Sequence, residues 1–147
     1  MKKNNINILF ILMLVASLFF TSLFFFQWNP LTKEKLDIKN KLESYYFDRC
    51  EFSSNKILIQ GWAVLHGKSH VLTSVYAEKS DGLFVKVEKS SQYREDVIRA
   101  FGGDKSLDKS GFMATRYISD KDSYTGKVII VSHGEDGYKY AAFNNCK

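Results

Sequence analysis

The segment YFDRCEFSSNKILIQGWAV, residues 46–64, decides the fold class. From residue 56 onward, Ile57, Ile59 and Gly61 fall on one face of an extended chain, and the residues between them fall on the other. Ser-Ser-Asn at 53–55 has the composition of a turn. The segment therefore predicts two strands, 46–52 and 56–64, joined by that turn.

The same alternation of strand-like segments and turns continues to the end of the chain. The further segments are 71–78, 83–89, 113–119, 128–132 and 138–143. About seven strands in about 100 residues, with turn signals every 8–12 residues, are typical of a β-sandwich. We therefore expect an all-β protein in which residues 47–147 form an Ig-like antiparallel β-sandwich.

The first 28 residues have a different composition. After two lysines, an almost unbroken apolar run extends from Ile6 to Trp28. As a helix it would span roughly 33 Å, enough for the hydrocarbon layer of a membrane. Bulky residues at 24–28 stand where a signal peptidase requires small ones, so we expect residues 1–28 to remain as a transmembrane signal anchor.

Residues 29–46 connect the anchor with the sandwich. Their apolar side chains recur at steps of seven, four and three, which places them on one side of a helix. These side chains are Leu31, Ile38, Leu42 and Tyr45. We expect a short juxtamembrane helix here, acting as a stalk or a packing element.

The two cysteines, Cys50 and Cys146, flank nearly the whole of the exported part. Neither has a Cys or His neighbour at the spacing of a metal site. In an oxidising compartment they would form a disulfide, closing a loop of about 97 residues that the chain-entropy model values at roughly 4–5 kcal/mol. Two unrelated buried thiols are the alternative.

The orientation of the anchor does not follow from charge alone, because lysines lie on both sides of the apolar run. An N-terminal apolar segment usually directs export, and the cysteines favour an oxidising space. We therefore expect a single-pass protein of a bacterial inner membrane, with a cytoplasmic N-terminus and a periplasmic or otherwise extracytoplasmic C-terminal domain.

The formal net charge is +5, with both signs interspersed, so no nucleic-acid partner is expected. One basic edge with interleaved aromatic residues would suit an anionic lipid or an acidic glycan, and a solvated surface is the alternative. Its members are Lys86, Lys89, Tyr93, Arg94, Arg99, Phe101, Lys105 and Lys109. Of these, Tyr93, Arg99 and Lys105 are our candidate contacts to a ligand or partner.

The other motifs are not specific enough to predict a catalytic or metal-binding site. Residues 61–69 resemble a phosphate-binding loop, but five residues separate the glycines and a strand follows. His66, His70 and His133 would bind zinc only if the fold gathered them, and solvated loop histidines are the simpler interpretation. With no nucleophile elbow or zincin pattern either, we predict no enzyme activity, no cofactor and no metal site.

Three short motifs occur in order along the chain: Gly61-Trp62-Ala63, Arg94-x-Asp96-Val97 and Gly111-Phe112. This order resembles the Ig-like β-sandwich module often appended to bacterial glycosyltransferases and other cell-surface polysaccharide proteins. Glu95 departs from the pattern, because proline is common at that position. The resemblance covers about residues 56–140 and implies an accessory domain in envelope glycan biology. It does not imply catalysis, since the transferase chemistry of such proteins belongs to a separate domain.

The residues of these motifs are expected to be structural. Arg94 and Asp96 would pin the loop by an ion pair, and Asp96 would cap a short helix that ends at Gly102-Gly103. We expect Trp62 to be a core aromatic residue between the sheets, with an exposed sugar-stacking platform as the alternative.

Three apolar side chains of the same region are expected to plug one end of the sandwich. They are Val97, Phe101 and Phe112.

These observations favour a non-catalytic, membrane-anchored domain that binds or organises another envelope component, an envelope protein or a glycan. Surface polysaccharide or O-antigen handling is the process that the resemblance indicates. A periplasmic immunity or exclusion protein against a bacteriocin or phage is the first alternative, and an envelope enzyme with an unrecognised site is the second. The oligomeric state does not follow from the sequence.

Overall fold

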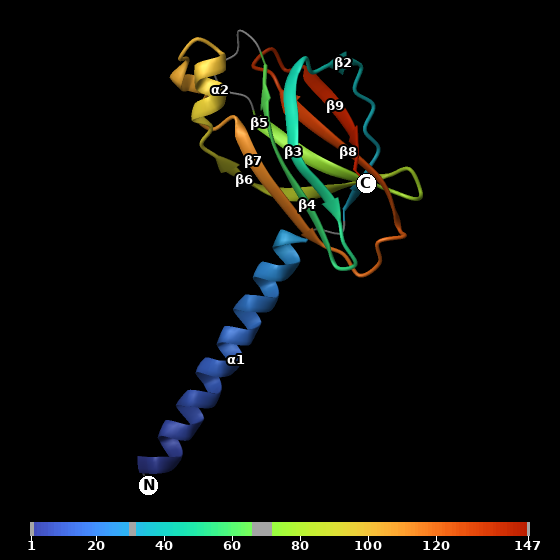
Figure 1. The fold of residues 1–147 in the computed structure, drawn as a ribbon. Coiled ribbons are helices and arrows are strands. Elements are labelled where there is room, and N and C mark those ends of the chain that lie inside the picture. The colour runs from blue at the N-terminus through green and yellow to red at the C-terminus, as the bar shows by residue number, and fades with distance from the viewer. Residues whose placement is uncertain (1, 30–31, 66–71, 147) are drawn as a thin grey trace. The chain divides into compact units, whose positions relative to one another are not determined.

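The computed structural model describes residues 2–29, 32–65 and 72–146, which belong to two compact units. The first unit consists of a single helix, α1 (Lys2–Trp28), drawn in blue in Figure 1. Its segment Asn7–Trp28 is long and apolar enough to cross a membrane, by length and composition. The hydroxyl groups of Thr21 and Ser22 donate to carbonyl oxygens four residues earlier, so the helix itself satisfies them.

The described part of the second unit is a nine-stranded sheet with two short helices in one connection. The helices are α2 (Glu95–Ala100) and η1 (Lys105–Leu107), between β6 and β7. The strands are β1 (Lys33–Glu34), β2 (Asn40–Lys41), β3 (Ser44–Phe52), β4 (Lys56–Val64), β5 (Leu72–Lys79), β6 (Phe84–Gln92), β7 (Gly111–Tyr117), β8 (Tyr124–His133) and β9 (Lys139–Asn145). The seven strands predicted from the sequence are confirmed as β3 to β9.

The strands form one continuous sheet in the order β2-β9-β8-β5-β6-β7-β4-β3, with β1 paired to β6. Strand β6 turns the corner, because its first part pairs with β1 and β5 and its second part with β7. The sheet therefore curls into a half-barrel (Figure 1). An all-β fold is confirmed, whereas an Ig-like sandwich of two separately bonded sheets is not.

The core lies between two halves of this curled sheet. We call β9, β8, β5 and the first part of β6 the strapped half, and β3, β4, β7 and the second part of β6 the bare half. Strand alternation sends every second side chain of both halves inward, and many of these side chains are at most 1% exposed. These include Ile57, Ile59, Val75, Val87, Phe112, Val128 and Ile130.

The expected helix within 29–46 is wrong, because the described residues 32–43 form an extended strap. The strap pairs with β6 through β1 and with β9 through β2. Between these pairings, Leu36 and Ile38 pack on the outer face of the strapped half. That face is formed by Tyr76, Phe84, Ile129, Val131 and Ala141.

The spacing of the strap explains why it is extended. Leu36 and Ile38 are two residues apart, so both reach the same surface only from an extended chain. Leu42 then enters the main core with no exposed surface, and its N–H donates to the Ala141 carbonyl at 2.9 Å. The outer face of the strapped half thus determines the conformation of the strap.

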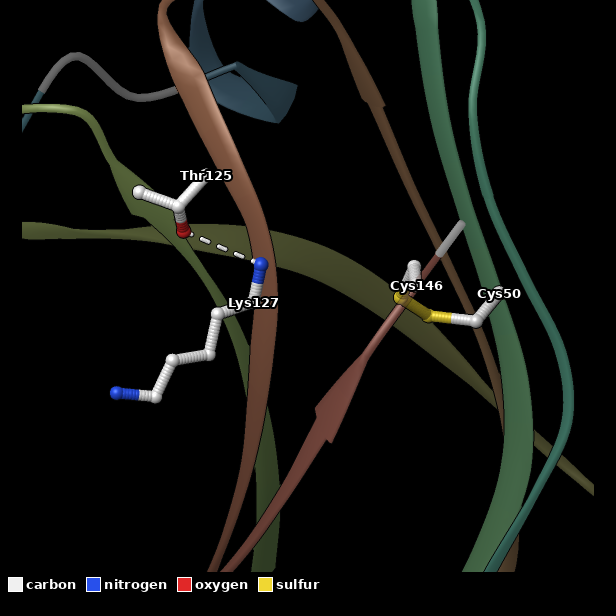
Figure 2. The surroundings of a disulfide bond; sticks show 4 residues. All are labelled: Cys50, Thr125, Lys127 and Cys146. Carbon is white, nitrogen blue, oxygen red and sulfur yellow. Dashed lines mark hydrogen bonds between the residues drawn. A yellow bond between two sulfur atoms is a disulfide. The ribbon is translucent and has the colours of Figure 1, made fainter.

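A disulfide joins Cys50 and Cys146, as predicted, with their Cα atoms 5.3 Å apart. Cys50 lies in β3, the edge strand of the bare half, and Cys146 follows β9 of the strapped half. Figure 2 shows the bond spanning the gap between these two ribbons. The N–H of Cys146 also donates to the Gly126 carbonyl at 2.9 Å. The disulfide therefore closes the half-barrel at the seam between β3 and β9, which do not pair.

Candidate functional site

The three sequence motifs meet at one place in the bare half. In the register of β4 and β7, Gly61 lies opposite Phe112, and Trp62 lies opposite Gly111. A Cβ atom at Gly61 would collide with the carbonyl oxygen of Tyr46 and crowd the Phe112 ring. A Cβ atom at Gly111 would collide with the side chain of Arg94. Both glycines are therefore required by close packing.

Arg94 holds this region together through two carboxylates. Its Nε and one terminal nitrogen donate to the two oxygens of Asp96 at 2.8 and 2.7 Å, and its other terminal nitrogen donates to Asp48. The predicted ion pair is thus confirmed. These hydrogen bonds from Arg94 lower the pKa of Asp96 from 3.8 to about 2. The hydrogen bond from Arg94 to Asp48 ties the start of α2 to β3.

The details of α2 differ from the prediction at its start and agree with it at its end. The N-cap is Arg94, without a capping side-chain bond, so Asp96 lies inside the first turn and does not cap. The carboxylate of Asp96 is already engaged by the guanidinium group. At the other end, Gly102 and Gly103 have φ values of +75° and +85°, and the Gly103 N–H donates to the Ile98 carbonyl at 2.8 Å.

The prediction that Trp62 is a core residue between the sheets is wrong. Ile59 and Ala63 lie in the core, and strand alternation therefore directs Trp62 to the outer face of the bare half. There its ring meets Phe101 edge-on, with 5.9 Å between the ring centroids. Of the three expected plug residues, Phe112 lies in the core, Val97 is buried on α2, and Phe101 packs on Trp62 instead.

A cavity of about 530 Å³ opens at one end of the half-barrel. It lies where β4 ends and β5 begins, and residues 105–110 form one wall. Its apolar lining is contributed by Ala63, Val64, Leu65, Leu72 and Leu107. Cavities of this size at the mouth of a barrel are ordinary places for a small ligand.

Charged and hydroxyl side chains complete the lining. The cations are Lys89, Lys105 and Lys109, and Asp108 is the carboxylate among the described lining residues. The hydroxyl groups belong to Thr73, Ser91, Ser106 and Ser110. Within the described residues, the buried Ser110 hydroxyl has no hydrogen-bond partner.

The wall formed by residues 105–110 is fixed to the sheet and to the motif region. The Ala63 N–H donates to the Ser110 carbonyl at 3.1 Å, and the Arg94 N–H donates to the Asp108 carbonyl at 3.2 Å. The Asp104 carboxylate accepts from the Ser106 N–H at 2.9 Å. The hydrogen bond of the Ser106 side chain, and secondarily that of its N–H, lowers the pKa of Asp104. The connection between β6 and β7 is therefore structural and also shapes the cavity.

The structure divides the predicted basic edge into separate roles. Lys89, Lys105 and Lys109 reach the cavity, so of our three candidate contacts only Lys105 lines it. Tyr93 is 67% exposed, and Arg99 is exposed on α2.

The sequence carried one signal for the cavity that our prediction did not use. Lys89 continues the inward alternation of Val85 and Val87, and it is paired with the core residue Ala114. A lysine on the apolar face of a strand marks a place where the core ends. The serines and the threonine of the lining carry no such signal, because they come from three separate segments.

Among residues 2–29, 32–65 and 72–146, no group of three or more His, Cys, Asp or Glu side chains is placed to hold a metal ion. His66 and His70 lie outside these residues, so solvated loop histidines, with zinc binding as the alternative, stay a prediction for them. Comparison with models of protein families, with curated proteins and with solved structures found no match to this chain.

Proposed function

We propose that this chain is a non-catalytic, membrane-anchored binding protein of the bacterial cell envelope that acts in the handling of surface polysaccharide. The observation that carries the proposal is the cavity at the mouth of the half-barrel, with its lysines and hydroxyl groups. Such a lining recognises polar, acidic envelope material. In this proposal α1 is the anchor, with its N-terminus in the cytoplasm.

The disulfide supports the proposed location. Disulfides persist in oxidising compartments, and this one closes the seam of the β domain. The Ig-like relationship belongs to the same proposal. Two halves that enclose one core correspond to the two layers of a sandwich, with β6 shared between them.

Site-specific photocrosslinking of the full-length protein in living cells tests the proposal. One photoreactive residue replaces Leu72, which lies on the cavity rim and is 78% exposed. The matched control replaces Tyr117, which is 52% exposed at the end of β7 and does not line the cavity. We expect a surface glycan, or a protein that assembles it, to be captured at Leu72 and not at Tyr117.

Two results would contradict the proposal. Equal capture at both positions would show that the cavity does not select its partner. Capture of a bacteriocin or phage component alone at Leu72 would replace the proposal by an immunity or exclusion role.

A further inference from the structure

The half-buried cation Lys89 indicates the kind of ligand that the cavity binds. Strand alternation directs its side chain to the inner face of β6, beside Ala114 of the core. Burial lowers the pKa of Lys89, and the nearby charge of Lys86 lowers it further. The charged amine is therefore in an environment where a counter-ion would stabilise it.

Lys33, Lys86 and Lys127 have such a counter-ion, whereas none is found for Lys89 among the described residues. Lys86 pairs with Glu88 at 3.0 Å, and Lys127 pairs with Glu78 at 3.3 Å. The hydrogen bond of Lys89 goes to the neutral Ser91 hydroxyl at 3.4 Å. Among the described lining residues, Lys105 and Lys109 add two further positive charges, against one carboxylate, Asp108. The cavity is therefore complementary to an anion.

The rest of the lining restricts the kind of anion. Four hydroxyl side chains share the described lining with the cations. The Ser91 hydroxyl already accepts from Lys89, whereas the buried Ser110 hydroxyl has no partner within the described residues. A ligand with several hydroxyl groups would give Ser110 a hydrogen-bond partner, and a hydrocarbon chain would not. The leucines of the lining suit the C–H face of a sugar ring. A volume of about 530 Å³ accommodates a ligand of one or two rings.

We propose that the cavity binds an acidic sugar unit, with Lys89 contacting its carboxylate or phosphate group and the serine and threonine hydroxyls contacting its ring. This inference rests on the proposed function and names the ligand class of the same site. Lys105 and Lys109, from the wall formed by residues 105–110, contact the same acidic group.

Isothermal titration of the full-length protein in lipid nanodiscs tests this assignment with four probes. They are glucuronate, glucose 6-phosphate, glucose and hexanoate. We expect at least one of the two acidic sugars to bind. Glucose, which lacks the acidic group, and hexanoate, which lacks the hydroxyl groups, should bind at least about tenfold more weakly. The stronger of the two acidic sugars identifies the anionic group.

Two variants locate the binding. Lys89→Met largely keeps the length of the side chain and removes its charge. It should weaken binding of the acidic sugar at least about tenfold. Lys127→Met is the matched control, because Lys127 pairs with Glu78 and does not line the cavity. It should leave binding unchanged. Thermal unfolding of both variants shows whether each is folded.

The inference is overturned if hexanoate binds as tightly as the acidic sugars, if no acidic sugar binds, or if folded Lys89→Met binds as the wild type does. These outcomes are separate from failure of the proposed function. An envelope glycan captured at Leu72 without acidic-sugar binding would leave the function standing and remove this ligand. Binding of an acidic sugar without capture of an envelope component would keep this ligand and remove the proposed function.

Discussion

The two halves of the sheet bury their outer faces to different extents. The strap covers the strapped half, where Ile129 and Val131 are 1% exposed on the outer face. The outer face of the bare half leaves Tyr46 and Tyr117 more than half exposed. The sequences differ accordingly, because β8 contains the four-residue apolar run 128–131, whereas in β7 the apolar run 112–114 is followed by the polar residues Thr115 and Arg116. A strand such as β8, which is covered on both faces, therefore shows no alternation of apolar and polar residues in its sequence.

The largest effect is expected where the two halves are joined covalently. Reduction of the disulfide, or Cys50→Ser with Cys146→Ser, should lower the free energy of unfolding by about 4–5 kcal/mol, because the open chain gains loop entropy. Urea unfolding followed by Trp62 fluorescence measures this change. An unchanged midpoint under reducing conditions would show that strand pairing and packing alone hold the halves together.

A pair of truncations tests the difference in coverage directly. Ile129→Ala removes a buried side chain beneath the strap and should cost about 2–5 kcal/mol. Tyr46→Ala removes an exposed side chain from the outer face of the bare half and should cost less than about 1 kcal/mol. The two free energies of unfolding are compared in urea. Equal losses would contradict the proposed difference between the outer faces.

The bare half depends on close backbone contact in place of a strap. Gly61→Ala should cost about 1–3 kcal/mol, because the new Cβ atom would force β3 and the Phe112 ring to move. Lys56→Ala, at an exposed position of the same strand, is the control and should have little effect. Thermal unfolding of both variants provides the comparison. A wild-type melting temperature for Gly61→Ala would mean that the strands separate there without cost.

At acidic pH, the bare half should lose the support of one ion pair. The pKa of Asp96 is lowered to about 2, so its contribution is complete above its ordinary value of 3.8 and is lost as the pH falls through 2. Asp96→Asn should therefore show a smaller loss of stability between pH 4 and pH 2 than the wild type. Melting temperatures across this range measure it. Parallel pH profiles of the two proteins would exclude a contribution from Asp96.

At alkaline pH, the corresponding effect should come from the strapped half and should be the smallest. Burial, and secondarily the carboxylate of Glu34 in the strap, raise the pKa of Tyr76 above its ordinary value of 10.0. Its contribution is complete below pH 10 and is lost as the pH rises through the higher value. Tyr76→Phe should flatten the alkaline loss of stability, and Tyr138→Phe, at an exposed position, should not. Identical alkaline profiles for both variants would contradict this role.

The sequence predicted the positions of the strands well, but it did not predict how the sheet curls into a half-barrel. Alternation and turn composition are local, so β3 to β9 were each recognised from their own residues. The corner in β6 depends on which partner each part of the strand meets, and no local pattern contains that information. The two cysteines were a usable long-range signal, because the pairing of two cysteines can be predicted from their number and the compartment alone.

The strap shows why a correct spacing led to a wrong helix. Ile38, Leu42 and Tyr45 fit a helical repeat, but the surface that receives the strap is built by residues such as Ile129 and Ala141, about a hundred positions later. Tertiary contact therefore overrode the local pattern. The motif region was predicted more accurately, since Arg94 and Asp96 are neighbours, whereas the cavity assembles residues from four segments.

The order of strap and disulfide along the chain has a mechanical consequence. In the anchored protein proposed here, tension from α1 enters the β domain at the strap, ahead of Cys50. The first connections to bear it are the two-residue pairing of β1 and the Lys33–Asp81 ion pair at 2.6 Å. Residues 50–146 are closed by a covalent bond and do not lengthen when the strap detaches. The strap can therefore extend under load while the sheet and its cavity stay intact.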